Sequence, residues 1–120
     1  MRYLVLSDIH ANVEGLDTCL ADAAPRGYDR VLVLGDIVGY GADPAACVEI
    51  VREACARGAV AVAGNHDVGA AGTAFDFNES AAEAIGWTRA MLDDDAVYRQ
   101  GDGNVYVDTT AAASIALYSV

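Results

Sequence analysis

The sequence predicts an α/β fold in which layered βαβ units build a mainly parallel sheet. In the first two thirds of the 120-residue chain, short apolar runs alternate with amphipathic stretches, as in strands that are joined by crossover helices. Residues 3–6, 31–34 and 59–63 are the expected strands, and their consecutive apolar positions suggest that both faces of the sheet are covered. This length has room for one core, so we expect a single domain over residues 1–120.

Three amphipathic stretches predict helices. Asn12 is a suitable N-cap for the first, which we expect to end near Ala24, before a proline and a glycine. The second has the clearest start, because Asp43 can serve as N-cap and Pro44 suits the first helical position. The third is expected over residues 79–92, with Ala82, Ile85, Trp87, Ala90 and Met91 as its packing positions.

The end of the chain follows a different pattern. An acidic turn comes after residue 92, and two further strands are expected at residues 104–108 and 115–120. Residues 93–120 are therefore expected to form a divergent tail of the same domain.

The composition excludes several classes of protein. Hydrophobic residues make up 54% of the chain and charged residues 21%, which predicts a packed globular protein. No apolar stretch approaches the roughly 18 residues that span a bilayer, so we expect a cytoplasmic protein without a membrane partner. The odd set of Cys19, Cys47 and Cys55 has no CxxC pair, which favours reduced, mostly buried thiols.

The charge is strongly acidic. The chain has seven basic residues, all arginine, and 18 acidic residues, which gives a net charge of -11. This balance argues against binding to nucleic acid. The bias is typical of halophilic proteins, with an acidic bacterial protein as the alternative. We expect the melting temperature to rise between about 0.1 M and about 3 M NaCl as salt screens the self-repulsion. A flat melting temperature would contradict the halophilic interpretation.

Polar side chains follow each expected strand. Asp8 and His10 come after the first strand, Asp36 after the second and residues 64–67 after the third. Because the carboxyl ends of parallel strands meet at one edge, where ligands bind in open α/β sheets, we expect these groups to converge. Two carboxylates, an imidazole and an amide oxygen suit a manganese, iron, zinc or nickel ion.

Each of these residues alone has an ordinary structural explanation, since aspartate caps helices and asparagine occupies turns. Their occurrence in order, each at a strand end, favours the metal site. Tyr40, which lies between Gly39 and Gly41, is expected to fill its loop rather than to contact a substrate.

The motifs Asp8-Ile9-His10, Gly35-Asp36-Ile37-Val38-Gly39 and Gly64-Asn65-His66-Asp67 resemble those of the calcineurin-like metallophosphoesterase superfamily. The longer run at residues 8–12, with residues 39–44, is similar to its small prokaryotic phosphodiesterases. The resemblance covers about residues 1–92. It implies a shortened metallophosphoesterase-like fold that hydrolyses a phosphomonoester or a phosphodiester.

The resemblance also implies the metal ligands. Asp8 and His10 would bind one ion, and Asp36 would bridge to a second ion about 3.5 to 4 Å away. Asn65 would bind that second ion. Manganese is the expected metal, with iron, zinc or nickel as alternatives.

Two further residues receive catalytic roles from the same resemblance. A metal-bound hydroxide would attack phosphorus in line, while His66 would donate a proton or a hydrogen bond to the leaving oxygen. Asp67 would orient the ring of His66. The expected substrate is a small phosphate ester.

The sequence departs from the family pattern in its histidines. The second half of full-length relatives carries three more histidine ligands, two of them in a GHxH motif, whereas this sequence has only His10 and His66. In one interpretation, water, carboxylates such as Asp76 or Asp108, or a partner chain or homo-oligomer complete the site. In the other, the chain is an inactive relative that binds a metal or a partner. We predict about one tightly held ion and a second only at high metal concentration, whereas two tight ions with the turnover of full-length relatives would argue against the inactive relative.

Overall fold

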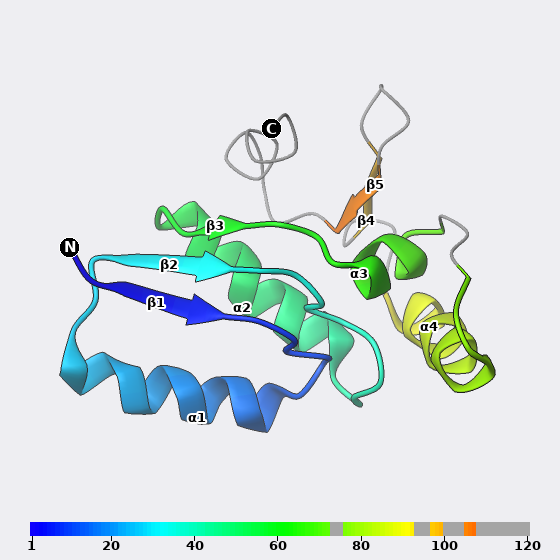
Figure 1. Ribbon diagram of the computed structural model, residues 1–120, viewed down its shortest axis with the longest axis horizontal. Coiled ribbons are helices and arrows are strands. Elements are labelled where there is room, and N and C mark those ends of the chain that lie inside the picture. Colours follow the sequence, from blue (N-terminus) through cyan, green and yellow to red (C-terminus); the bar gives the residue numbers. More distant parts are fainter. Residues whose placement is uncertain (73–75, 93–96, 100–104, 108–120) are drawn as a thin grey trace.

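The computed structural model describes residues 1–72, 76–92, 97–99 and 105–107, the last two ranges by their backbone only (Figure 1). In chain order, its elements are β1 (Tyr3–Leu6), α1 (Val13–Ala23), the 3₁₀ helix η1 (Ala24–Arg26), β2 (Arg30–Val33), α2 (Pro44–Ala56), β3 (Val60–Ala61), α3 (Asn65–Ala70), α4 (Glu79–Met91), β4 (Val97–Arg99) and β5 (Val105–Val107).

The first three strands form one parallel sheet in the order β1-β2-β3. Leu6 pairs in register with Val33, which pairs with Ala61. Helix α1 joins β1 to β2 and helix α2 joins β2 to β3, so the carboxyl ends of all three strands lie at one edge (Figure 1). The predicted α/β fold with a mainly parallel sheet is confirmed, and β4 and β5 form a separate antiparallel pair.

Among the described residues, one face of the parallel sheet is covered better than the other. Leu16 of α1 and Val51 of α2 belong to a buried core with Val33 of β2. On the opposite face, Tyr3 is 54% exposed and Val5 is 51% exposed. The expectation that both faces are covered is wrong for β1, because its exposure alternates along the strand as in a half-buried sheet.

The predicted helix starts are confirmed, although only one of the two capping side chains makes its bond. The side chain of Asn12 accepts a hydrogen bond from the N–H of Gly15 at 2.8 Å, and α1 ends at Ala23. Helix α2 starts at Pro44, but the side chain of Asp43 makes no capping hydrogen bond. The fixed φ of a proline at the first position therefore contributes to this start.

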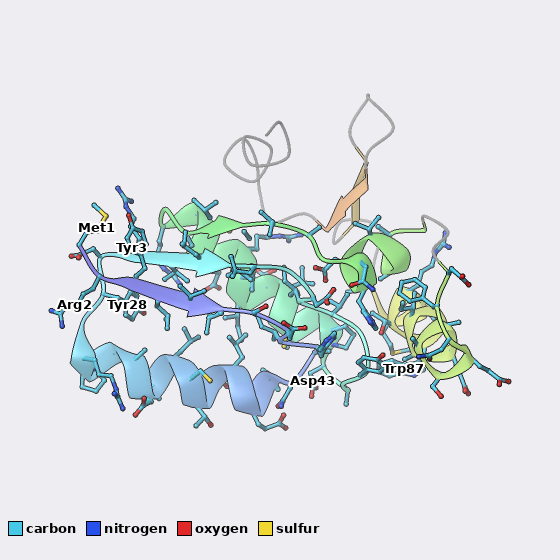
Figure 2. The ribbon with its side chains drawn as sticks, in the orientation of Figure 1. Met1, Arg2, Tyr3, Tyr28, Asp43 and Trp87 are labelled. Carbon is cyan, nitrogen blue, oxygen red and sulfur yellow. The ribbon has the colours of Figure 1, made fainter. Side chains whose placement is uncertain are left out.

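Helix α4 packs through a different stripe from the expected one. Ala81, Ile85 and Thr88 are its buried positions, and this i, i+4, i+7 spacing is that of a single helix face. Among the predicted packing residues Ile85 is buried, whereas Trp87 is 42% exposed and Met91 51% exposed, and Ala82 and Ala90 are exposed too. Figure 2 shows Trp87 on this helix. The predicted packing positions were chosen by residue type, but the helical period of about 3.6 residues determines which side chains are buried.

The tail is described in part. The strand expected at residues 104–108 corresponds to β5, and β4 is a strand that the sequence analysis did not predict. The strand expected at residues 115–120 lies outside the described residues. Within the described ranges, no helix combines the length and the apolar character needed to cross a bilayer.

The three cysteines are free, but they differ in accessibility. Cys47 is fully buried, Cys55 is partly buried and Cys19 is exposed. The expectation of mostly buried thiols is therefore wrong for Cys19, which lies on the solvent side of α1. Burial raises the pKa of the Cys47 thiol to about 11, with a further contribution from the Asp43 carboxylate.

We expect thiol reagents to distinguish these cysteines. Because the thiolate is the reactive form, Cys47 should resist alkylation in the folded chain at mildly alkaline pH, while Cys19 should react rapidly. Mass spectrometry of the alkylated peptides measures both rates, and denaturant should make them similar. Rapid labelling of Cys47 in the folded chain would contradict its buried position.

Candidate metal centre

The three expected polar loops meet at the carboxyl edge of the sheet. The N–H of Asp8 donates to the carbonyl of Gly35 at 3.2 Å, and the N–H of His10 donates to the carbonyl of Asp36 at 2.8 Å. The third loop is equally close, since a Cβ placed on Gly35 would lie 2.6 Å from the backbone nitrogen of Gly64. The convergence of the loops is therefore as predicted.

Asp8, His10 and Asp36 form a group whose ligand atoms all lie within 4.8 Å of one another. Nε2 of His10 lies 3.6 Å from Oδ1 of Asp8. The side chain of Asp8 is 66% exposed and that of His10 is 23% exposed, so the group opens to solvent on the side of Asp8. Two carboxylates and one imidazole at this spacing fit a divalent transition metal.

The ring of His10 is oriented for this role. Its Nδ1 lies 3.2 Å from the backbone carbonyl of Val38. A carbonyl can only accept, so this bond requires Nδ1 to carry a hydrogen, and Nε2 is then the ring nitrogen that could bind a metal ion. This contact of Val38 has no signature in the sequence, because any residue type supplies a backbone carbonyl.

The backbone of the same loops is strained. Among the described residues, five non-glycine residues have a left-handed φ, and all five follow β1 or β2. Three of them are the grouped residues Asp8 (53°), His10 (49°) and Asp36 (52°). Such conformations cost roughly 1 to 3 kcal/mol each and persist where the surrounding structure imposes them, often at functional sites. The other two are Ala11 (56°) and Tyr40 (58°).

Asp36 also ties its loop to the start of α3. Its Oδ1 accepts a hydrogen bond from the backbone N–H of His66 at 3.0 Å. Gly64 permits this approach, because a Cβ at that position would collide with the same Oδ1. Asn65 is the first residue of α3 and is exposed. Its role as a metal ligand stays a prediction.

His66 is buried among aromatic rings. It is 7% exposed, and its ring centroid lies 4.9 Å from that of His10 and 5.4 Å from that of Phe77. Burial lowers the pKa of His66, although the Asp36 carboxylate opposes this effect. Nδ1 of His66 is buried without a hydrogen-bond partner, and a Cβ on Gly39 would lie 2.6 Å from it.

Asp67 does not orient that ring in the structure. Its Oδ1 accepts a hydrogen bond from the N–H of Val38 at 3.0 Å, and its Oδ2 accepts one from the N–H of Gly64 at 2.8 Å. Asp67 is 0% exposed, and this burial raises its pKa to about 6 against the opposing effect of these hydrogen bonds. The expectation that Asp67 orients His66 is corrected: the carboxylate holds the second and third loops together.

Tyr40 is the residue whose position the sequence analysis mistook. It is 56% exposed, and its ring centroid lies 5.1 Å from that of His10 and 4.7 Å from that of His66. A residue that fills its loop would be buried, so the expectation is wrong. The signal available in the sequence was a large aromatic residue between two glycines in the loop that carries Asp36.

Comparison with known proteins identifies the family of this chain. The calcineurin-like phosphoesterase family matches residues 1–115. An uncharacterised protein of Methanocaldococcus jannaschii is 46% identical over 90 residues, which are 73% of this chain and 36% of that protein. The crystal structure of a metallophosphoesterase from Sphaerobacter thermophilus aligns with a TM-score of 0.62 and 37% identity over 85% of this chain and 44% of that one. The chain thus spans less than half the length of either relative, and it belongs to the calcineurin-like phosphoesterase family.

Proposed function

We propose that this chain hydrolyses a small phosphate ester, a phosphomonoester or a phosphodiester, with a divalent metal ion held by Asp8, His10 and Asp36. The convergence of their three ligand atoms within 4.8 Å carries the proposal. Left-handed backbone at all three residues supports it, since such strain gathers at functional sites. Membership of a phosphoesterase family supports the class of reaction.

Manganese is the ion that we propose, with iron, zinc or nickel as alternatives for the same donor set. When bound, the ion would neutralise charge on the phosphate group and provide an activated water. The chain supplies the orientation: the carbonyl of Val38 holds the His10 ring, and the N–H of His66 holds Asp36. Both contacts leave ligand atoms free to face the ion.

A second ion would find fewer ligands. Asp36 and Asn65 are the residues that the resemblance assigns to it. Asp76 is exposed and is not part of the grouped side chains, and Asp108 lies outside the described residues. Water or a partner chain would have to provide the remaining ligands. We therefore propose one tightly bound ion and a second that binds only at high metal concentration.

Elemental analysis of the purified chain, combined with an aryl phosphodiester assay, tests the function. We expect about one tightly held ion per chain and slow hydrolysis that depends on added metal. The ion should stabilise the fold by about 2.7 kcal/mol at a concentration of 100 times Kd. A chain whose melting temperature does not respond to any divalent metal would contradict the proposal.

A second candidate is an inactive relative that binds metal or a partner without turnover. It is favoured by the ligand group of the described residues, in which three side chains suffice for one ion only. Tight metal binding without any hydrolysis would identify this candidate. Two tightly bound ions with rapid turnover would exclude it and would show that other groups complete the site.

His66 is proposed to assist the leaving group. Burial lowers the pKa of His66 and the Asp36 carboxylate opposes this effect, and the ring would donate a proton or a hydrogen bond to the departing oxygen. The ring centroids of His66 and His10 are 4.9 Å apart, so His66 lies beside the proposed ligands. Asp67 would act indirectly, by holding the loops that place this ring.

Replacing His66 with glutamine should slow the hydrolysis of an alkyl phosphate ester more than that of a nitrophenyl ester. The nitrophenolate anion leaves without a proton, whereas an alkoxide needs one, and general acid assistance is typically worth ~10² to 10⁴ in rate. The measurement is kcat/KM for both esters, with melting temperature as the control for folding. Equal losses on the two esters would argue for a positioning role.

A further inference from the structure

Tyr40 presents an aromatic ring at the border of the candidate metal centre. One side of the residue contacts the rings of His10 and His66, at centroid distances of 5.1 Å and 4.7 Å, yet 56% of its surface is exposed. Its φ of 58° is unfavourable for a residue with a bulky side chain. The fold therefore accepts backbone strain at the position that exposes this ring.

An open hollow of about 450 Å³ adjoins the ring. Tyr40 lines it together with Asp8 and His10, so the hollow borders the proposed metal ligands. The remaining wall comes from the starts of α1 and α2, which are linked by a hydrogen bond of 3.1 Å from the N–H of Asp43 to the carbonyl of Ala11. Figure 2 shows Asp43 close to the start of α1. The volume suits a small molecule.

The charge of the hollow restricts what it can bind. Asp8, Glu14 and Asp43 line it, and no arginine is among its lining residues in the part of the chain that the structure describes. Glu14 and Asp43 lie at the starts of α1 and α2, where the helix dipole favours a negative side chain. A second phosphate or carboxylate on the ligand would be repelled there, while an uncharged ring would not.

We propose that Tyr40 is a specificity residue that stacks against an uncharged planar ring carried by the phosphate ester, either an aryl group or a nucleobase. The inference rests on the proposed function, because it places the phosphate at Asp8, His10 and Asp36. From there, the hollow beside Tyr40, which borders both Asp8 and His10, offers space for an ester substituent. Every base and aryl group offers the same aromatic face, so the shared chemistry is that of π-stacking.

Calorimetric titration of the manganese-loaded chain with phenylphosphonate and methylphosphonate tests the proposal without turnover. The two ligands share the group that would bind the metal and differ in the ring. Loss of an aromatic stacking partner typically weakens binding about 5- to 150-fold. We expect phenylphosphonate to bind the wild-type chain at least about tenfold more tightly than methylphosphonate.

Two substitutions of Tyr40 distinguish the effect of the aromatic ring from the effect of side-chain size. Tyr40→Phe should keep the preference for phenylphosphonate, whereas Tyr40→Leu, which keeps an apolar side chain, should lose it. Manganese affinity and melting temperature, measured on both variants, show that each is folded and loaded. A parallel comparison of uridine 5′-monophosphate with ribose 5-phosphate distinguishes a nucleobase from a simple aryl group as the preferred ring.

Three results would overturn the proposal. Equal binding of the two phosphonates by the wild-type chain would exclude stacking while leaving the phosphate site in place. If Tyr40→Leu still preferred phenylphosphonate over methylphosphonate, the phenyl ring would have to bind another part of the hollow. If manganese binds and neither phosphonate does, the proposed phosphoesterase function fails together with the stacking.

Discussion

Alanine in place of Asp36 should abolish tight metal binding and metal-dependent hydrolysis together. Asp36 belongs to the grouped ligands, and the resemblance assigns it to both ions. Loss of groups that merely support a metal ligand already costs about 10- to 100-fold in affinity, so loss of the ligand itself should exceed about 100-fold. Calorimetric titration with manganese and the aryl phosphodiester assay measure the two effects.

Two matched variants show whether this loss is due to the ligand. Asp36→Asn can still accept the hydrogen bond from the N–H of His66 but lacks the negative charge, so its fold should persist while its metal affinity falls. Asp22→Asn removes an equal charge from an exposed pair with Arg26, and it should bind metal like the wild type. Wild-type affinity in Asp36→Ala would disprove the proposed centre.

The second large effect is expected from Asp67→Ala, which should destabilise the fold by about 1 to 3 kcal/mol. The substitution would leave the N–H groups of Val38 and Gly64 without their acceptor. An unsatisfied buried donor costs about 1 to 3 kcal/mol, and Val38 is fully buried. Urea denaturation of the metal-free chain, followed by circular dichroism, gives the free energy of unfolding.

A graded series tests this explanation. Asp67→Asn offers one accepting oxygen and places an NH₂ group against the other donor, so its loss should be intermediate. Asp76→Ala removes an exposed carboxylate of the same region and should change stability by less than about 0.5 kcal/mol. If Asp67→Ala were as stable as Asp76→Ala, the carboxylate would not be what joins the two loops.

The parts of the fold with local chemical signals were predictable. The β1 strand, the cap at Asn12 and the start of α2 at Pro44 agree with the sequence analysis, because a short apolar run, a capping side chain and a fixed φ are signals within a few residues. The convergence of the site residues was also predictable, because the loops that follow parallel strands all lie at the same edge of the sheet. Asp8, His10 and Asp36 were thereby brought together as expected.

What could not be predicted depends on distant neighbours. Whether Tyr3 and Val5 are buried is decided by what lies on the sheet, and strand composition does not report it. The partners of Asp67 are backbone N–H groups of residues 38 and 64, which any residue type could provide. The expectation that Trp87 is a packing residue was wrong for a different reason. The helical period could be read from the sequence, but the expectation was based on residue type.

The parallel order of the strands also determines when a metal ion can act during folding. Asp8 and Asp36 follow neighbouring strands joined by α1, and a parallel pair cannot close through a short turn. The hydrogen bond from His10 to Asp36 therefore forms only after a long loop has closed. An ion held by Asp8, His10 and Asp36 together would need this closure first. We therefore expect bound metal to lengthen the lifetime of the native state by slowing unfolding rather than to speed folding.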